Sequence, residues 1–122
     1  MKIYISHASS YDYREELYRP LKSFFKDHEL FLPHEGDNSE LHAKDVLPTC
    51  ELLLAEVSFP STGQGIELGV AHMLNKPVLC IHKVGARPSS SLKYITDKIV
   101  EYKNLSDILP TLQIELARIE SA

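Results

Sequence analysis

The segment 58–65, SFPSTGQG, carries residue types suited to binding a small anion. Ser61 and Thr62 supply hydroxyl donors, while Gly63 and Gly65 allow backbone to approach a ligand closely. A helix is predicted directly after this segment, and the free N–H groups at a helix start attract negative charge. The same spacing is typical of an ordinary capped turn before a helix, so from the residues alone both interpretations stand.

A carboxylate follows this segment closely. Glu67 falls in the first turn of the predicted helix, where the positive helix end favours the ionised form that a nucleophile needs. Asp45, near the end of the preceding predicted helix, and Tyr4, inside the first predicted strand, are further candidates. Each also has an ordinary interpretation: a complement to the helix dipole, a solvated helix residue and a core aromatic, respectively.

Short apolar runs alternate with longer amphipathic stretches, as in a parallel sheet covered on both faces. The predicted strands are Lys2–Ser6, Glu29–Leu32, Glu51–Val57, Pro77–His82 and Lys98–Tyr102. The predicted helices are Tyr11–Asp27, a segment capped by Ser39 and ending near Pro48, Ile66–Leu74 and Leu105–Glu120. We therefore expect an α/β, flavodoxin-like three-layer sandwich with strand order 2-1-3-4-5, in a single domain over residues 1–122.

Ligands of such sheets bind beyond the carboxyl ends of the strands, where the strand order reverses. In this chain the crevice lies between the exits of the first and third strands. Ser6 and His7 stand at the first exit, and the segment 58–65 stands at the second. The fold prediction therefore brings these two groups of polar residues to one site.

Composition narrows the class of ligand. The formal net charge of −4 argues against a nucleic-acid polymer, which requires a basic stripe. No run approaches the roughly 18 to 20 apolar residues of a membrane span, and we expect no signal peptide and a cytoplasmic location.

Cys50 and Cys80 lack CxxC spacing and are expected to be buried free thiols. No HxH or HExxH pattern occurs, so we expect neither a metal nor a cofactor.

Three rival chemistries of flavodoxin-like folds lack their residues in this chain. A phospho-receiver domain needs acidic residues after the first strand and an aspartate ending the third. Those positions hold Ser6 and His7, and Val57 and Ser58. A cysteine phosphatase needs a cysteine after the first strand and a flavodoxin needs a glycine there, but the segment SHASSY contains neither.

The block 55–69, AEVSFPSTGQGIELG, resembles the nucleoside 2-deoxyribosyltransferase superfamily. It is most similar to the branch that hydrolyses 2′-deoxynucleoside 5′-monophosphates, and the segment 75–80, NKPVLC, matches a strand entry of that branch. The similarity is dense from about Leu53 to Ser91. It implies cleavage of the sugar–base bond of a nucleotide, with release of free base and sugar phosphate.

The resemblance also implies roles for individual residues. Glu67 corresponds to the nucleophile, Asp45 to the acid that serves the departing base, and Tyr4 to a tyrosine that positions sugar and nucleophile. Ser61 corresponds to a residue that holds the 5′-phosphate. Ser91 matches a serine that reaches the phosphate from a partner subunit, which implies a homodimer or a larger homo-oligomer.

The chain departs from the family pattern near the expected site. His7 and Ala8 stand where relatives have a loop with glycine and serine, and Pro48 lies in a shortened stretch after Asp45. The block between the second and third strands is compressed, and His34 within it is expected to be exposed. Two alternatives to a hydrolase therefore stay open: a deoxyribosyltransferase that exchanges bases, and a non-catalytic nucleotide-binding module.

Overall fold

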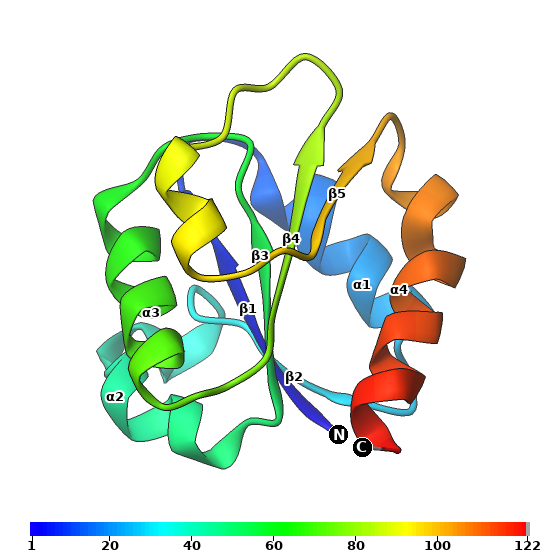
Figure 1. Ribbon diagram of the computed structural model, residues 1–122. Helices are drawn as coiled ribbons and strands as arrows, with labels where there is room; N and C mark the ends of the chain where they lie inside the picture. The colour runs from blue at the N-terminus through cyan, green and yellow to red at the C-terminus, as the bar shows by residue number, and fades with distance from the viewer. Residues whose placement is uncertain (122) are drawn as a thin grey trace.

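The computed structural model describes residues 1–121, with parallel strands in the order β2-β1-β3-β4-β5. The strands are β1 (Lys2–His7), β2 (Glu29–Phe31), β3 (Leu52–Glu56), β4 (Val78–Lys83) and β5 (Ile99–Tyr102). The predicted strand order is therefore confirmed, and each strand lies within one or two residues of its predicted position. All neighbouring strands are parallel, so they point toward one end of the sheet, as the arrowheads of β4 and β5 show in Figure 1.

Side chains of the central strands alternate between the two faces of the sheet. On β1, Ile3 and Ile5 pack into one apolar cluster, while Tyr4 packs into the other. β1 runs beside β3 with Tyr4 opposite Leu53 and Ser6 opposite Ala55. This register sets Tyr4 and Ser6 on the same face of the sheet, because side chains two residues apart on a strand share a face.

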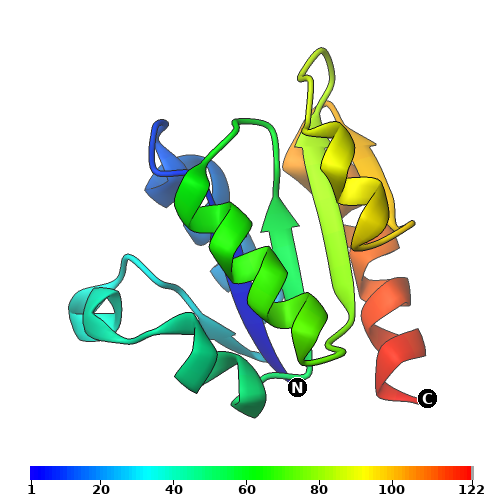
Figure 2. The same ribbon diagram turned by 60° about the vertical axis from the view of Figure 1, so that its left-hand side comes forward.

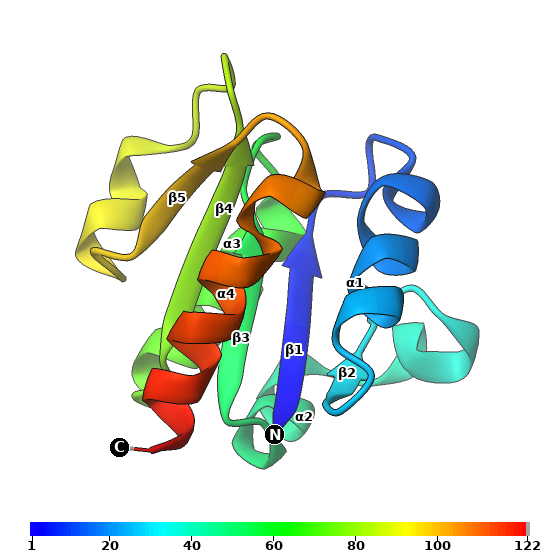
Figure 3. The ribbon, with the colours of Figure 1, turned by 90° about the vertical axis from the view of Figure 1, so that its right-hand side faces the viewer.

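Helices cover both faces. α1 (Arg19–Phe24) and α4 (Leu105–Glu120) lie over one face, and α2 (Ala43–Val46) and α3 (Thr62–Met73) lie over the other (Figures 1 and 3). The predicted bounds of the last helix are confirmed. Its start is fixed by a capping box, in which Asn104 and Asp107 exchange side-chain and backbone hydrogen bonds.

Two predicted helices were placed wrongly. The segment after β2 forms a 3₁₀ turn, Gly36–Glu40, and α2 begins only after His42, so Ser39 caps no helix. α3 begins at Thr62 rather than at Ile66. The hydroxyl of Ser61 accepts a hydrogen bond from the Gln64 N–H, which is enough to start the helix inside the predicted turn.

The predicted helix 11–27 is shorter and irregular. A π-helical segment, Arg14–Tyr18, runs directly into α1, which ends at Phe24. The segment turns both Leu17 and Tyr18 into the core.

Cys50 and Cys80 are buried free cysteines, as expected. Within residues 1–121, no helix is long and apolar enough to cross a bilayer.

Candidate active site

Glu67 is held by two hydroxyl groups from β1. Tyr4 donates a hydrogen bond of 2.6 Å to Oε2, and Ser6 donates one of 2.7 Å to Oε1. Tyr4 and Ser6 are almost completely buried, whereas Glu67 keeps partial access to solvent. Figure 2 shows α3, which carries Glu67, lying across the face of the sheet. Three of the predicted site residues thus form one hydrogen-bonded group, with each carboxylate oxygen accepting one bond.

The electrostatics of Glu67 differ from the expectation. Because α3 begins at Thr62, Glu67 lies in its second turn, beyond the strongest effect of the helix dipole. Burial raises the pKa of Glu67 above its ordinary value, while the hydrogen bonds from Tyr4 and Ser6 and the charge of the nearby His34 imidazole lower it. The net pKa of Glu67 is raised, and the ionised form is favoured by these specific donors, which partly oppose burial, rather than by the helix start.

Within residues 1–121, neither Asp45 nor His34 makes a side-chain hydrogen bond with this group, and both are exposed. Asp45 is exposed on α2, a helix that packs against α3. Its side chain makes no hydrogen bond or ion pair within residues 1–121, and its role as an acid stays a prediction. His34 is exposed as expected, yet its imidazole lies close enough to Glu67 to affect the pKa of that carboxyl.

The predicted phosphate-binding residues line a separate cleft of about 470 Å³. The cleft lies between the start of α3 and the 3₁₀ turn Ser90–Tyr94. Its polar lining consists of the side chains of Ser61, Thr62, Gln64, Ser89 and Ser91. The structure therefore brings Ser61 and Ser91 of one chain together, next to the free N–H groups of the first turn of α3.

The two predicted glycines lie inside α3 rather than in a turn. An added Cβ at Gly65 would meet no atom within 4 Å, and one at Gly63 would reach only Ser61 Oγ, at 4.0 Å. Gly65 also lines the cleft. Both positions are therefore open, and neither glycine is required by its neighbours within the described chain.

The cleft and the Glu67 group stand on different sides of α3. Glu67 does not line the cleft, and it lies six positions after Ser61, about 9 Å along the helix axis. A ligand in contact with both must extend along the start of α3. A sugar phosphate is such a ligand, because its anomeric carbon and its phosphate are at opposite ends of the molecule.

His7 points away from Glu67, to the α1 face of the sheet, where it is 4% exposed. Its Nδ1 lies 2.7 Å from the Ala8 carbonyl and its Nε2 lies 2.5 Å from the Tyr18 hydroxyl. These partners assign the neutral ring with Nδ1–H donating and Nε2 accepting. Burial lowers the pKa of His7 to about 4. The predicted contact of His7 with substrate stays a prediction, and its ring leaves the Glu67 side of β1 free.

Sequence reasoning missed a buried carboxylate at the end of β3. Glu56 is 1% exposed, and its signal in the sequence is a charged residue within the apolar run ELLLAEV. It also missed Gln64, which is 4% exposed and has no comparable signal. Among residues 1–121, no group of three or more histidine, cysteine or acidic side chains could hold a metal ion.

No protein-family model matches the sequence. A protein of Syntrophotalea carbinolica provisionally named 2′-deoxynucleoside 5′-phosphate N-hydrolase 1 is 38% identical over 88 residues, 68% of this chain and 61% of that protein. The chain is homologous to the 2′-deoxynucleoside 5′-phosphate N-hydrolases. This finding confirms the resemblance seen in the sequence.

Two further N-hydrolases match over shorter segments. A protein of Methanosarcina mazei with the same provisional name is 36% identical over 70 residues, 56% of this chain and 44% of that protein. The 5-hydroxymethyl-dUMP N-hydrolase of Rattus norvegicus is 40% identical over 50 residues, 39% of this chain and 31% of that protein. The matched regions thus span about three fifths or less of the length of these N-hydrolases.

Solved structures share the fold. The CMP N-glycosidase BcmB of Clostridium botulinum superposes with a TM-score of 0.69 over 93% of this chain and 99% of that one, at 18% identity. A conserved protein of Enterococcus faecalis superposes with a TM-score of 0.64 over 94% of this chain and 98% of that one, at 17% identity. These superpositions agree with the α/β fold and strand order described above.

Proposed function

We propose that the protein is an N-glycosidase that hydrolyses the bond between base and sugar in 2′-deoxynucleoside 5′-monophosphates. The observation that carries this proposal is the Glu67 carboxylate, held by Tyr4 and Ser6 beside a hydroxyl-lined cleft at the start of α3. The homology to N-hydrolases supports the same reaction.

Glu67 is the nucleophile in this proposal. A carboxylate oxygen attacks C1′ of the sugar while the C1′–N bond breaks, and the bonding electrons leave with the base nitrogen. Asp45 gives that nitrogen a proton, and the sugar phosphate stays bound to Glu67 as an ester. The Tyr4 and Ser6 hydroxyls orient the carboxylate and leave a lone pair on each oxygen free to react.

Water completes the reaction. It attacks C1′, passes a proton to the Asp45 carboxylate, and releases Glu67 as the ester bond breaks. Free base and 2-deoxyribose 5-phosphate are the products, and both carboxyl groups return to their starting states. Two displacements at one carbon retain its configuration.

The 5′-phosphate occupies the cleft in this proposal. Hydroxyls of Ser61 and Ser91 and the N–H groups at the start of α3 supply its donors. This arrangement favours a nucleotide over an unphosphorylated nucleoside, and therefore favours the hydrolase over a transferase that acts on free nucleosides. In this proposal Ser6 acts on the sugar indirectly, by its hydrogen bond to Glu67, and does not contact the phosphate.

A homodimer is part of the proposal. Ile66 on α3 is 62% exposed and Tyr94, at the end of the turn that carries Ser91, is 73% exposed. These apolar side chains come from the two elements that bound the cleft, so a second copy packed there brings its own Ser91 near the first cleft. Two-fold symmetry then makes the contribution reciprocal.

The test is chromatography of the protein after incubation with the four deoxynucleoside monophosphates, their ribo counterparts and the free deoxynucleosides. We expect free base from deoxynucleotides with the wild type and with Glu101→Gln, which alters an exposed glutamate on β5, and none with Glu67→Ala. Base exchange on addition of a second nucleobase would identify a transferase. Binding of nucleotide without release or exchange would identify a binding module.

A further inference from the structure

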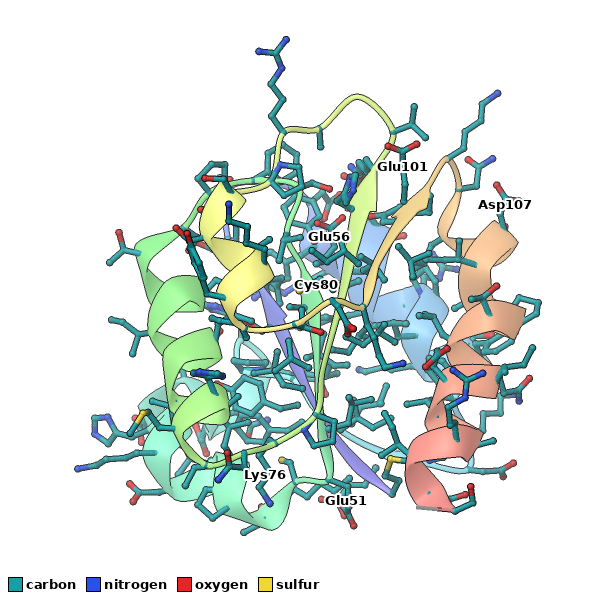
Figure 4. All side chains as sticks on the ribbon, in the orientation of Figure 1. Glu51, Glu56, Lys76, Cys80, Glu101 and Asp107 are labelled. Atoms are coloured by element: carbon teal, nitrogen blue, oxygen red, sulfur yellow. The ribbon has the colours of Figure 1, made fainter. Side chains whose placement is uncertain are left out.

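Glu56, the last residue of β3, is a buried carboxylate that the proposed reaction does not use. Its side chain lies on the face of the sheet opposite Glu67, where Tyr102 of β5 reaches it. Figure 4 labels Glu56 near the carboxyl ends of the strands, at the same end as Glu101 and opposite Glu51. Glu56 therefore directly precedes the segment 57–61, which leads from β3 into α3.

The carboxylate of Glu56 holds the beginning of this segment. Ser58 donates its N–H to Oε1 at 2.6 Å and its hydroxyl to Oε2 at 3.0 Å, and the Tyr102 hydroxyl also donates to Oε2. The Ser58 hydroxyl in turn accepts the Lys83 N–H of β4 at 2.8 Å. One side chain thereby joins the exit of β3 to both β4 and β5.

The main chain of Glu56 holds the other end of the segment. Its carbonyl accepts a hydrogen bond of 2.7 Å from the Gln64 side chain, in the first turn of α3. The Gln64 N–H in turn donates to the hydroxyl of Ser61. Gln64 and Ser61 both line the cleft. Glu56 is therefore connected by hydrogen bonds to two residues of the cleft wall.

Folding alone does not account for an ionisable group at this place. Replacing a buried charge by an apolar side chain of similar volume is often neutral or stabilising. What an apolar side chain cannot do is accept the N–H of Ser58, whose direction is fixed by the backbone. Fixing that N–H fixes the shape of the segment before any ligand arrives, which lowers the cost of binding.

We propose that Glu56 is a positioning residue that holds the segment 57–61 in the shape that receives the substrate phosphate, without touching the substrate. The inference rests on the proposed function and assigns Glu56 to nucleotide affinity rather than to the chemistry at Glu67. It predicts an effect on KM that depends on the phosphate group.

Two variants separate positioning from general stability. Glu56→Leu leaves the Ser58 N–H without an acceptor. Glu56→Gln keeps one oxygen for that N–H, and its amide can donate to the Ser58 and Tyr102 hydroxyls, which can rotate to accept. Glu101→Gln is the matched control, because it removes an exposed carboxylate from the same end of the sheet. Circular dichroism and thermal melting establish that each variant is folded.

For a deoxynucleoside monophosphate, we expect Glu56→Leu to raise KM about tenfold while kcat stays within about twofold. Glu56→Gln raises KM less than about threefold. For the free deoxynucleoside, kcat/KM is the same in all variants. Equal losses for nucleotide and nucleoside, or an unchanged KM in Glu56→Leu, would overturn the inference.

Calorimetry in a Glu67→Ala background measures binding without turnover. We expect Glu56→Leu to weaken nucleotide binding about tenfold there as well. If the wild type releases no base and this weakening is still observed, the positioning role stands and the proposed reaction fails. If the wild type releases base and nucleotide binding is unchanged by Glu56→Leu, the positioning role alone fails. Absence of nucleotide binding by the Glu67→Ala protein, together with no base release by the wild type, would overturn both.

Discussion

The hydroxyl of Tyr4 donates a hydrogen bond of 2.6 Å to Glu67 across 63 residues of sequence. Burial raises the pKa of the Tyr4 phenol, and its contact with the Glu67 carboxylate raises it further. Tyr4 therefore stays protonated and acts only as a donor at ordinary pH. The same bond lowers the pKa of Glu67, which burial otherwise raises. The hydrogen bond from Tyr4 therefore favours the ionised form of Glu67 and partly opposes the effect of burial.

Tyr4→Phe removes this donor. The pKa of Glu67 then rises further, because burial is opposed by fewer hydrogen bonds. Since the ionised form reacts, the acidic limb of the kcat/KM profile moves to higher pH, and kcat/KM at neutral pH falls roughly tenfold to a hundredfold. Ser6→Ala shifts the limb in the same direction. A limb that stays in place in both variants would show that another group titrates.

Ser61 has two roles that substitution can separate. Ser61→Ala removes the cap of α3, at a cost of about 1 kcal/mol, together with a proposed phosphate donor. Ser61→Asp keeps a capping oxygen but sets a negative charge toward the cleft. We expect a near-normal melting temperature for Ser61→Asp, with nucleotide KM raised at least tenfold and nucleoside turnover unchanged. Equal losses on both substrates would place the phosphate elsewhere.

Asp45 is tested by the leaving group. If it protonates the departing base, Asp45→Asn slows release of ordinary bases by roughly a hundredfold. A sugar phosphate carrying a nitrophenolate leaving group needs no proton and keeps near-normal turnover. His34→Gln, which alters the imidazole near Glu67, is the comparison. If His34→Gln slows release of ordinary bases but not of nitrophenolate, and Asp45→Asn shows no such difference, the acid is His34 and not Asp45.

His7 makes stability depend on pH. Its folded pKa of about 4 lies below the ordinary value of 6.5, so its contribution is complete above pH 6.5 and is lost as pH falls toward 4. The full loss is about 3 kcal/mol, at about 1.4 kcal/mol for each pKa unit. Urea titrations should show a smaller decline over this range in His7→Gln than in wild type or in His72→Gln, an exposed control. Identical slopes in all three would contradict the buried neutral ring.

Mixing two inactive variants tests the contribution of Ser91 across subunits. In a mixed dimer of Glu67→Ala and Ser91→Ala chains, one site combines an intact Glu67 with the intact Ser91 of its neighbour. Random mixing therefore restores about a quarter of the wild-type activity if the neighbour supplies Ser91. Because Ser91 also lines the cleft of its own chain, a mixture without recovery would assign it to that chain alone.

The fold was predictable because short apolar runs alternate with longer amphipathic stretches along the chain. The run before Ser58 is typical of a buried central strand, and right-handed crossovers together with the chain length favoured the observed strand order. Helix boundaries were less accessible. Ser61 favours the start of a helix, whereas Gly63 and Gly65 favour a turn. Sequence alone does not show that the hydrogen bond from Gln64 N–H to Ser61 starts α3 at Thr62.

The positions of Glu67, Tyr4 and Ser6 in the predicted elements made them candidates, and the family resemblance gave Glu67 and Tyr4 their expected roles. Tyr4 and Ser6 are two residues apart on one strand, so their shared face was predictable once β1 was assigned. Glu56 was missed because its donors come from β5 and from the segment it precedes, contacts that only the folded chain defines. The direction of His7 was likewise decided by the Tyr18 hydroxyl, which is distant in sequence.

The central claim is that Glu67 bonds to C1′ of the sugar. Rapid quenching of wild-type protein with a deoxynucleoside monophosphate, followed by intact-mass and peptide mass spectrometry, tests it most directly. We predict a mass increase equal to one deoxyribose 5-phosphate residue on the peptide that carries Glu67, absent from Glu67→Gln and unchanged in Glu101→Gln. Base release by the wild type with no such adduct during turnover, or an adduct on another residue, would contradict Glu67 as the nucleophile.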